Sequence, residues 1–210
     1  MKAINPEKLG LSKEKLMAME SFFKEKYIQN GKLAGIQTLV ARKGKVVHFK
    51  STGLRDVENN KKIEKDTIFR IYSMTKPITS VALMQLFEQG LFQLADPVSK
   101  FLPEFKNPKV FLSGSYPHFM TSPAEREITI RDLLTHTAGL TYGFHYRTNV
   151  DHAYRKVWSG PRGDNTDFSF PPLDLENFSK SIASLPLEFS PGDKWNYSVA
   201  TDICLSLIHI

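Results

Sequence analysis

Three serine–lysine pairs in this 210-residue chain have the spacing Ser-x-x-Lys, in which a lysine amine can activate a serine hydroxyl as a nucleophile. The pairs are Ser12–Lys15, Ser21–Lys24 and Ser73–Lys76. Residues three apart lie on one face of a helix, so each hydroxyl and amine can meet where the segment is helical. The surroundings of each pair must therefore decide which one does chemistry.

The surroundings favour the third pair. Ser12 begins an amphipathic segment, where a serine is a routine helix cap. Ser21–Lys24 lies inside the same segment, where both groups can face water. The Ser73–Lys76 pair instead follows the apolar stretch Ile68–Tyr72 and opens the most apolar helix predicted for the chain.

This position has chemical consequences for Ser73 and Lys76. Burial and the positive end of the helix dipole both favour the neutral lysine amine that a general base requires. Backbone amides in a first helical turn lack helical partners, so the amide of Ser73 can stabilise an oxyanion. The alternative is that Ser73 only caps the helix and that Lys76 lays its stem along apolar surface. The residues alone leave both interpretations open.

Hydrophobic periodicity, caps and turn residues predict the elements that hold this pair. An antiparallel hairpin is expected around Lys43-Gly44, and a capping arrangement at Thr129-Ile-Arg-Asp132. Residues 141–172 are aromatic and turn-rich. The expected elements are a helix over 12–29, strands over 35–42 and 45–53, and helices over 73–89, 130–135 and 175–184. We expect an α/β fold in which the sheet packs on the first helix, a helical sub-domain spans the middle, and the 73–89 helix is buried at their junction.

Composition excludes several functions. The charge of +6 is spread along the chain, so we expect no nucleic-acid partner. The 6 histidines show no zinc-binding spacing, and no metal or cofactor is expected. No apolar run approaches the roughly 18 residues of a membrane span, and the N-terminus lacks the apolar core of a signal peptide. With the single cysteine Cys204, these features predict a cytoplasmic protein without membrane attachment. A Gly-x-Ser-x-Gly elbow and a phosphate-binding loop are both missing.

Four segments in order resemble the serine β-lactamase-like superfamily, which includes penicillin-binding proteins, class C β-lactamases and family-eight carboxylesterases. The resemblance runs from about Ala34 to Asp202. Its segments are Ile71-Tyr-Ser-Met-Thr-Lys-Pro-Ile-Thr-Ser80, Leu94-Ala-Asp-Pro-Val98, Ile130-Arg-Asp-Leu-Leu-Thr-His-Thr-Ala-Gly-Leu140 and Pro191-Gly-Asp-Lys-Trp-Asn-Tyr-Ser198. It implies a β-lactamase/transpeptidase-like fold, with an antiparallel sheet flanked by helices and a helical sub-domain.

The resemblance also implies roles for individual residues. Ser73 would attack a carbonyl and form an acyl-enzyme, Lys76 would take its proton, and Tyr197 would relay protons to the leaving group and to water. The sequence does not settle which of Lys76 and Tyr197 is the base. Tyr142 and Phe144 are expected to border the substrate pocket, with core packing as their alternative. A histidine in the third segment, His136, is expected to order a turn.

One difference from the sequence pattern of class C β-lactamases bears on which of the family's activities to expect. Val199 stands where class C β-lactamases carry an asparagine. This difference favours a carboxylesterase acting on small or medium acyl esters. The alternatives are a β-lactamase or D-Ala-D-Ala peptidase that uses the same residues on an amide, and a non-catalytic binding module of the same fold. The expected partner is a small-molecule ester or amide.

The family's third motif, a Lys-, His- or Trp-containing glycine segment that supplies the second oxyanion donor, does not follow Tyr197 in this sequence. Leu205-Ser-Leu-Ile-His-Ile210 resembles a translated adaptor of sequencing libraries. We therefore expect residues 1–204 to be the N-terminal part of a β-lactamase-related domain, apparently truncated, and residues 205–210 to be a non-native tail. On this view the 210-residue chain is nearly inactive and exposes an unpaired strand edge.

Overall fold

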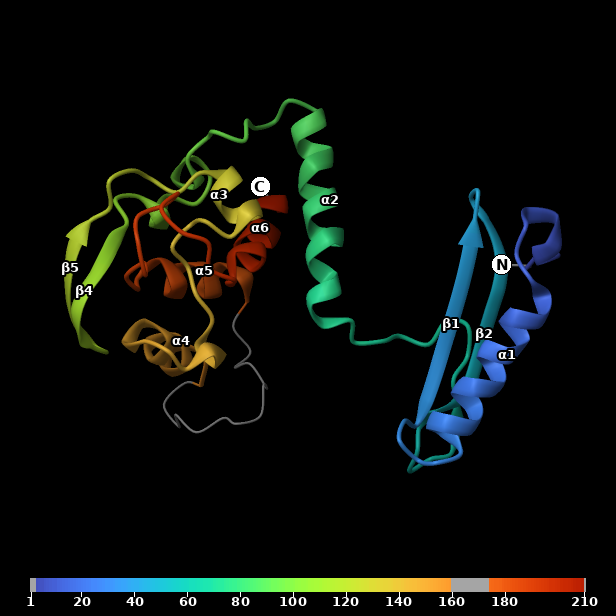
Figure 1. Ribbon diagram of the computed structural model, residues 1–210. Coiled ribbons are helices and arrows are strands. Elements are labelled where there is room, and N and C mark those ends of the chain that lie inside the picture. Colours follow the sequence, from blue (N-terminus) through green and yellow to red (C-terminus); the bar gives the residue numbers. More distant parts are fainter. Residues whose placement is uncertain (1–2, 160–173, 210) are drawn as a thin grey trace. The chain divides into compact units, whose positions relative to one another are not determined.

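The computed structural model describes residues 3–159 and 174–209 (Figure 1). Its chain forms two compact units, Met1–Arg70 and Ile71–Ile210, each with its own helices and strands. Both units mix helices with antiparallel strands. No helix in the described parts of the chain is long and apolar enough to cross a bilayer.

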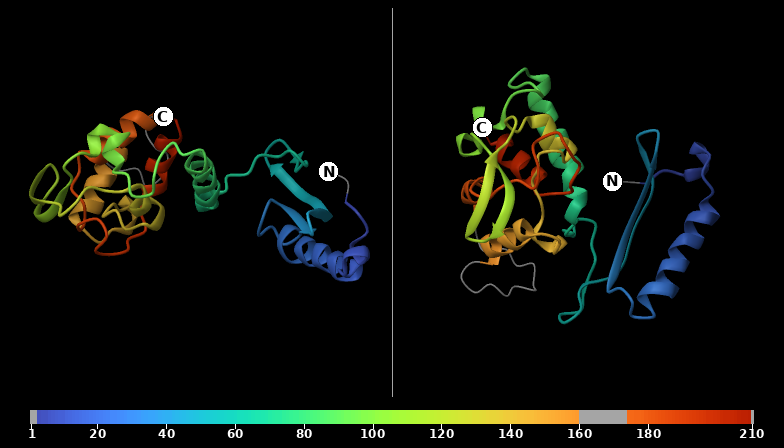
Figure 2. Two further views of the ribbon diagram at one scale, coloured as in Figure 1. Left: turned by 90° about the horizontal axis from the view of Figure 1, so that it is seen from above. Right: turned by 60° about the vertical axis from the view of Figure 1, so that its left-hand side comes forward.

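The first unit is a helix laid on a three-stranded antiparallel sheet of order β1-β2-β3. The predicted hairpin is confirmed, with Lys43 and Gly44 both at positive φ in its turn. Figure 2 shows α1 running along one face of the hairpin. The elements are a 3-10 turn Pro6–Leu9, α1 Lys13–Phe23 continued by a π-helical turn Lys24–Ile28, β1 Gly35–Arg42, β2 Lys45–Asp56 and β3 Lys61–Lys62.

Polar contacts fix how α1 meets the hairpin. Ser12 caps α1, with its Oγ accepting a hydrogen bond from the Lys15 amide at 3.1 Å, which is the role predicted for it. Glu20 reaches down from α1 to the buried His48, with 3.4 Å between Oε1 and Nδ1. His48 Nε2 lies 2.7 Å from Thr38 Oγ1. Glu20, His48 and Thr38 therefore connect the helix to the sheet. The Ser12–Lys15 pair has a structural role, because Ser12 caps the helix.

The second unit consists of helices and one two-stranded hairpin. α6 packs against α2, α3 and α5. Its buried core includes Leu83, Ile130, Leu133, Leu140, Ile182 and Ile203. The elements are α2 Thr75–Glu88, β4 Lys109–Ser115, β5 His118–Pro123, α3 Ile130–Thr135, α4 Asn149–Ser159, α5 Leu175–Ala183 and α6 Ala200–Ile208, with 3-10 turns at Tyr72–Met74, Val98–Lys100, Pro103–Phe105 and Gly143–His145.

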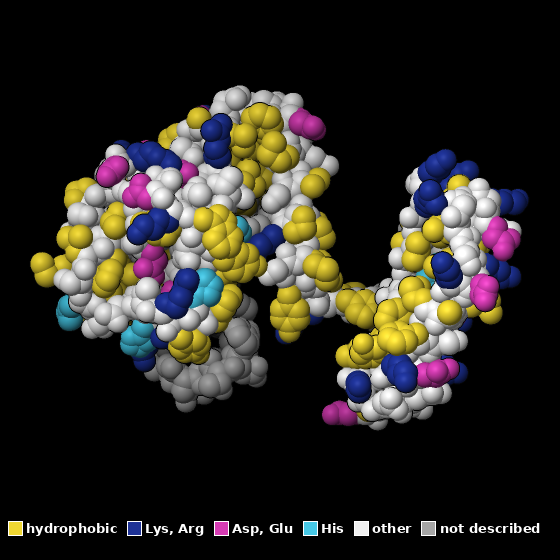
Figure 3. All heavy atoms as spheres, in the orientation of Figure 1, with side chains coloured by type: hydrophobic (Ala, Val, Ile, Leu, Met, Phe, Trp, Pro, Cys, Tyr) yellow, Lys and Arg dark blue, Asp and Glu magenta, His cyan; other side chains and the backbone are white. Residues whose placement is uncertain are grey.

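Within the second unit, α2 is buried on one face. Only Thr79 and Leu83 are buried, whereas Ile78 and Val81 are 62% and 61% exposed. Figure 3 shows apolar side chains on the surface along this helix. In this unit α6 covers one face of α2, and burial of the helix against the sheet of the first unit stays a prediction.

Three elements of this unit went unpredicted. The β4–β5 hairpin replaces part of the expected helical sub-domain, and α4 begins in the segment interpreted as a loop. A detectable signal marked α4, because Thr148-Asn-Val-Asp151 repeats the Thr-x-x-Asp capping pattern. Thr148 Oγ1 accepts from the Asp151 amide at 3.0 Å, and Asp151 Oδ2 accepts from the Thr148 amide at 3.3 Å. The part of the predicted 141–172 loop from residue 160 onward lies outside the described residues.

The third unpredicted element, α6, includes most of the segment expected to be a tail. Residues 205–208 continue the helix, Leu207 is buried, and Ser206 Oγ lies 2.8 Å from Ser179 Oγ. The assignment of residues 205–210 as non-native stays a prediction.

An ion pair holds the segment that leads into α3. The buried Asp132 carboxylate accepts hydrogen bonds from Arg126 Nη1 at 2.6 Å and from Arg126 Nη2 at 2.9 Å, and it closes the predicted capping box with Thr129. Burial acts to raise the pKa of Asp132, but the hydrogen bonds from Arg126 and Thr129 outweigh it and lower the pKa from 3.8 to about 2. The ionised carboxylate therefore stabilises the folded state.

Replacing Asp132 with asparagine is expected to lower the free energy of unfolding by about 2 kcal/mol at neutral pH. Because the folded pKa is depressed, this contribution is complete above 3.8 and disappears as the pH falls through about 2. Urea unfolding of both proteins between pH 7 and pH 3 measures it. A difference that stays constant down to pH 3 would contradict the ionic origin.

Candidate active site

The proposed nucleophile lies in the turn before α2. The helix predicted to start at or near Ser73 is α2, which begins at Thr75, and Ser73 belongs to the preceding 3-10 turn. Tyr72 has φ +47, a left-handed conformation that costs a non-glycine residue energy and occurs often at functional sites. The turn leaves Ser73 exposed, with its Oγ 2.6 Å from the Tyr197 hydroxyl oxygen.

Lys76 lies in the first turn of α2, between two tyrosines. Its half-buried amine donates a hydrogen bond to the Tyr142 hydroxyl at 3.0 Å. The same amine is 4.8 Å from the centre of the Tyr197 ring. Ser73, Lys76 and Tyr197 therefore meet in one place, where Tyr197 contacts both other residues, and their catalytic roles stay predictions.

Tyr197 lies on the segment between α5 and α6, and its neighbours in sequence are buried. Its ring packs against the rings of His136 at 4.9 Å and Tyr142 at 5.3 Å. Burial acts to raise the pKa of Tyr197, but hydrogen bonding with Ser73 and Lys76 and the lysine charge lower it below its ordinary value of 10. This hydroxyl is therefore the more acidic of the site's two tyrosines.

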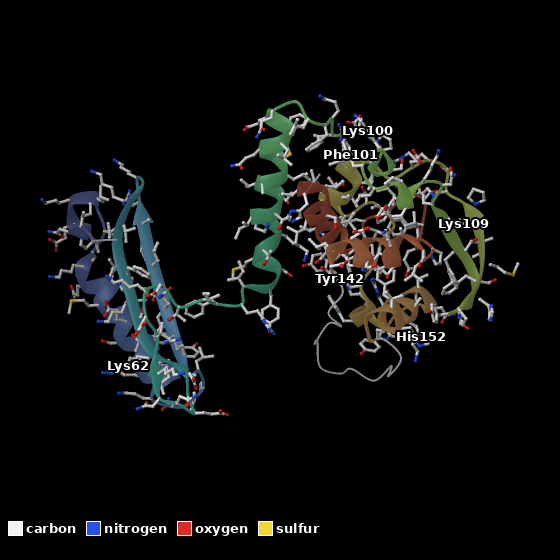
Figure 4. All side chains as sticks on the ribbon, turned by 180° about the vertical axis from the view of Figure 1, so that it is seen from behind. Lys62, Lys100, Phe101, Lys109, Tyr142 and His152 are labelled. Atoms are coloured by element: carbon white, nitrogen blue, oxygen red, sulfur yellow. The ribbon has the colours of Figure 1, made fainter. Side chains whose placement is uncertain are left out.

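Tyr142 has the opposite electrostatics. Burial, and then the nearby Asp202 carboxylate, raise the pKa of Tyr142 far above its usual range. The Tyr142 hydroxyl donates to Asp202 Oδ2 at 3.4 Å while it accepts from Lys76. Tyr142 lies close to the N-terminal end of α2 (Figure 4). The two environments therefore push the pKa values of these tyrosines apart, down for Tyr197 and up for Tyr142.

Asp202 is a site residue that sequence reasoning missed. It lies in the first turn of α6, where burial raises the pKa of its carboxyl and the Lys76 charge acts to lower it. No pattern in the sequence marked it, because its partners are 60 residues away at Tyr142 and further still at Lys76. Lys76, Tyr142 and Asp202 therefore form a chain of hydrogen bonds that begins at the Lys76 amine.

His136 ends α3 in a left-handed conformation, with φ +58. Its Nδ1 accepts a hydrogen bond from the Ser198 amide at 3.3 Å and lies 3.2 Å from Ser198 Oγ. Burial, and then the Lys76 charge, lower the pKa of His136, which favours the neutral ring that accepts these bonds. The histidine thus holds the residue that follows Tyr197. Three residues after His136, Gly139 has φ +80, and a Cβ there would lie 2.3 Å from the Phe189 carbonyl oxygen, so only glycine fits this position.

Phe144 lies at the outer side of this cluster. Its ring stacks on Tyr142 with 4.6 Å between centres, and its side chain is 41% exposed. Tyr142 is buried and contacts Lys76, so the structure places the two predicted pocket residues at different depths. Their contact with substrate stays a prediction. Within residues 3–159 and 174–209, no group of three His, Cys, Asp or Glu side chains could hold a metal ion.

Comparison with known proteins gives a consistent assignment. A protein of Mycobacterium tuberculosis is 37% identical over 173 residues, which cover 82% of this chain and 40% of the relative. Esterase EstB of Burkholderia gladioli is 32% identical over 201 residues, covering 96% of this chain and 47% of the esterase. The solved structure of EstCE1, described as a hydrolase with promiscuous acyltransferase activity, matches with a TM-score of 0.70 at 29% identity, covering 91% of this chain and 45% of that one.

The chain spans less than half the length of these relatives. The matched structures have the β-lactamase/transpeptidase fold, so the predicted fold class is confirmed. The family model named Beta-lactamase matches residues 19–208, which include all four segments that carried the resemblance. Because that match covers most of the sequence, this chain belongs to the beta-lactamase family.

Proposed function

We propose that this protein is a serine hydrolase that forms an acyl-enzyme on Ser73 and acts as a carboxylesterase on small or medium acyl esters. The observation that carries the proposal is the 2.6 Å contact between Ser73 Oγ and the hydroxyl of Tyr197, whose pKa is lowered. A nucleophile paired with a base that is oriented by a third group is the arrangement that covalent catalysis requires. Here Lys76 is the third group.

In the proposed reaction, the Tyr197 phenolate accepts the Ser73 proton while Oγ forms a bond to the ester carbonyl carbon. The backbone amide of Ser73 stabilises the resulting oxyanion. Collapse of this intermediate breaks the bond to the alcohol, and the Tyr197 phenol returns the proton to the departing oxygen. Water, deprotonated by the same phenolate, then attacks the acyl carbon, and collapse of that intermediate breaks the bond to Ser73 Oγ, which takes its proton back from the Tyr197 phenol. The Lys76 amine, which contacts the Tyr197 ring, stabilises the phenolate, and Tyr197 is the immediate base.

Two observations support an ester over a β-lactam. EstB and EstCE1 are named as an esterase and a hydrolase with acyltransferase activity. Val199, which replaces an asparagine of class C β-lactamases, is 1% exposed and belongs to the core. An apolar side chain buried there offers no polar group to a substrate.

The test compares p-nitrophenyl butyrate with a chromogenic cephalosporin on the protein expressed from its complete reading frame. We expect kcat/KM for the ester to exceed that for the cephalosporin by about 100-fold or more, since the site lacks the amide that a β-lactam uses. The Ser73→Ala variant serves as the background. A preference for the cephalosporin would favour the β-lactamase alternative. Turnover of neither substrate would favour the non-catalytic binding module.

The 210-residue chain itself is proposed to be nearly inactive. The Ser73 amide is one proposed oxyanion donor, and no glycine follows Tyr197 in this sequence to form the motif expected to supply a second. Loss of one donor commonly costs about 10²–10³-fold in kcat. Ester turnover by this chain and by the product of the complete reading frame, assayed side by side, measures the difference. Equal rates would refute the need for a second donor.

A further inference from the structure

We propose that Asn196 and Arg147 are positioning residues that fix the distance between Tyr197 and Tyr142, an inference that rests on the proposed function. Neither side chain takes part in the proposed reaction of Ser73, Lys76 and Tyr197. Both connect the segment that carries Tyr197 to the segment that carries Tyr142.

Asn196 joins the two segments directly. Its side chain is 8% exposed, and its Nδ2 donates to the Leu140 carbonyl oxygen at 2.9 Å. Its backbone amide donates to the His136 carbonyl oxygen, also at 2.9 Å. Leu140 is two residues before Tyr142, and Asn196 immediately precedes Tyr197. One buried amide therefore spans the backbones of both tyrosine segments.

Arg147 completes the hydrogen bonding of that amide. Its Nη2 donates to Asn196 Oδ1 at 2.7 Å and also contacts His145 Nδ1. The His145 ring packs edge-on against Tyr142, with 6.0 Å between ring centres. Burial, and then the Arg147 charge, lower the pKa of His145, which favours a neutral ring that accepts from Arg147. The guanidinium thus has one contact toward each tyrosine.

The arrangement matters because Lys76 lies between the two rings. Its amine is 5.4 Å from the centre of the Tyr142 ring and 4.8 Å from that of Tyr197. A change in the separation of the tyrosine segments would move Tyr197 relative to both Lys76 and Ser73. Displacement of a catalytic group by about 1 Å can cost about 10²-fold in rate. Asn196 and Arg147 therefore act on the reaction through Tyr197.

The test is a double-mutant cycle of Asn196→Ala and Arg147→Met on the product of the complete reading frame, with nitrophenyl ester kinetics as the readout. We expect Asn196→Ala to lower kcat by about 10–100-fold with KM within about threefold. Arg147→Met, a change at a side chain that is 56% exposed, should lower kcat by about 3–10-fold. In the Asn196→Ala background, Arg147→Met should have a smaller effect than in the wild type, because its contact with Asn196 is already lost and only its contact with His145 remains. Arg131→Met, at an exposed arginine of α3, is the matched control and should leave kcat unchanged.

The pH profile separates positioning from general destabilisation. In both variants the ionisation that limits kcat at low pH should move upward, because Tyr197 loses part of its contact with Lys76. Additive effects in the cycle, or an unchanged profile, would overturn the inference. If Asn196→Ala does not fold, Arg147→Met alone decides, through its kcat and its profile. If Ser73→Ala abolishes turnover while both variants match the wild type, only this inference fails; if Ser73→Ala retains turnover, the proposed function fails.

Discussion

Replacing Tyr197 with phenylalanine is expected to lower kcat/KM for a nitrophenyl ester by about 10²–10⁴-fold, the usual contribution of a positioned general base. The variant keeps the ring between His136 and Tyr142 but removes the oxygen that lies 2.6 Å from Ser73 Oγ. In the wild type the phenolate is the active form, so the rate should rise with pH through an ionisation below 10. That rise should be absent from the variant.

A suitable control is Tyr146→Phe, which removes a hydroxyl from a nearby tyrosine that is 69% exposed. It should leave kcat/KM within about twofold, as is usual for a surface change away from the chemistry. Steady-state kinetics from pH 5 to pH 10 on the three proteins make the comparison. Retention of wild-type rate by Tyr197→Phe would exclude Tyr197 as the base and return that role to Lys76.

Replacing Lys76 with methionine is the second change with a large expected effect. Methionine preserves most of the stem but removes the charge that contacts Tyr197 and the donor to Tyr142. The pKa of Tyr197 should then rise, because burial continues to raise it while the lysine no longer lowers it. We expect kcat/KM to fall by about 10²–10⁴-fold at pH 7 and to recover partly at pH 10, where more of the phenol ionises.

Lys194→Met provides the control, because Lys194 is exposed and lies on the same segment as Tyr197. It should show wild-type rates at every pH. The measurement is the pH dependence of kcat/KM for both variants. If Lys76→Met lowers the rate equally at pH 7 and pH 10, Lys76 does not act through the ionisation of Tyr197.

Local patterns predicted the elements whose stabilising contacts are close in sequence. The 43–44 turn, the Ser12 cap and the Thr129–Asp132 capping box each involve residues within three positions, and all are present. The same reasoning could have found α4, since Thr148–Asp151 has an equivalent spacing. The β4–β5 hairpin went unpredicted, because its position in the fold depends on which elements pack together.

In the candidate site too, local patterns predicted some residues, whereas residues that depend on long-range contacts were missed. Resemblance in ordered segments brought Ser73, Lys76 and Tyr197 together, although no local pattern links Tyr197 to the serine 124 residues away. Asp202 and Asn196 were missed because their contacts reach across the fold to Tyr142 and Leu140. The left-handed Tyr72 was also invisible, since tyrosine carries no preference for that conformation. Long-range contacts therefore supplied what composition and spacing did not.

The central claim is that Ser73 is the nucleophile, and a covalent probe tests it most directly. The protein from the complete reading frame is treated with a fluorophosphonate, digested, and analysed by mass spectrometry for the modified serine. We predict one adduct per chain, on the peptide that contains Ser73, and none in Ser73→Ala. An adduct on Ser12 or Ser21, or labelling that persists in Ser73→Ala, would contradict the account.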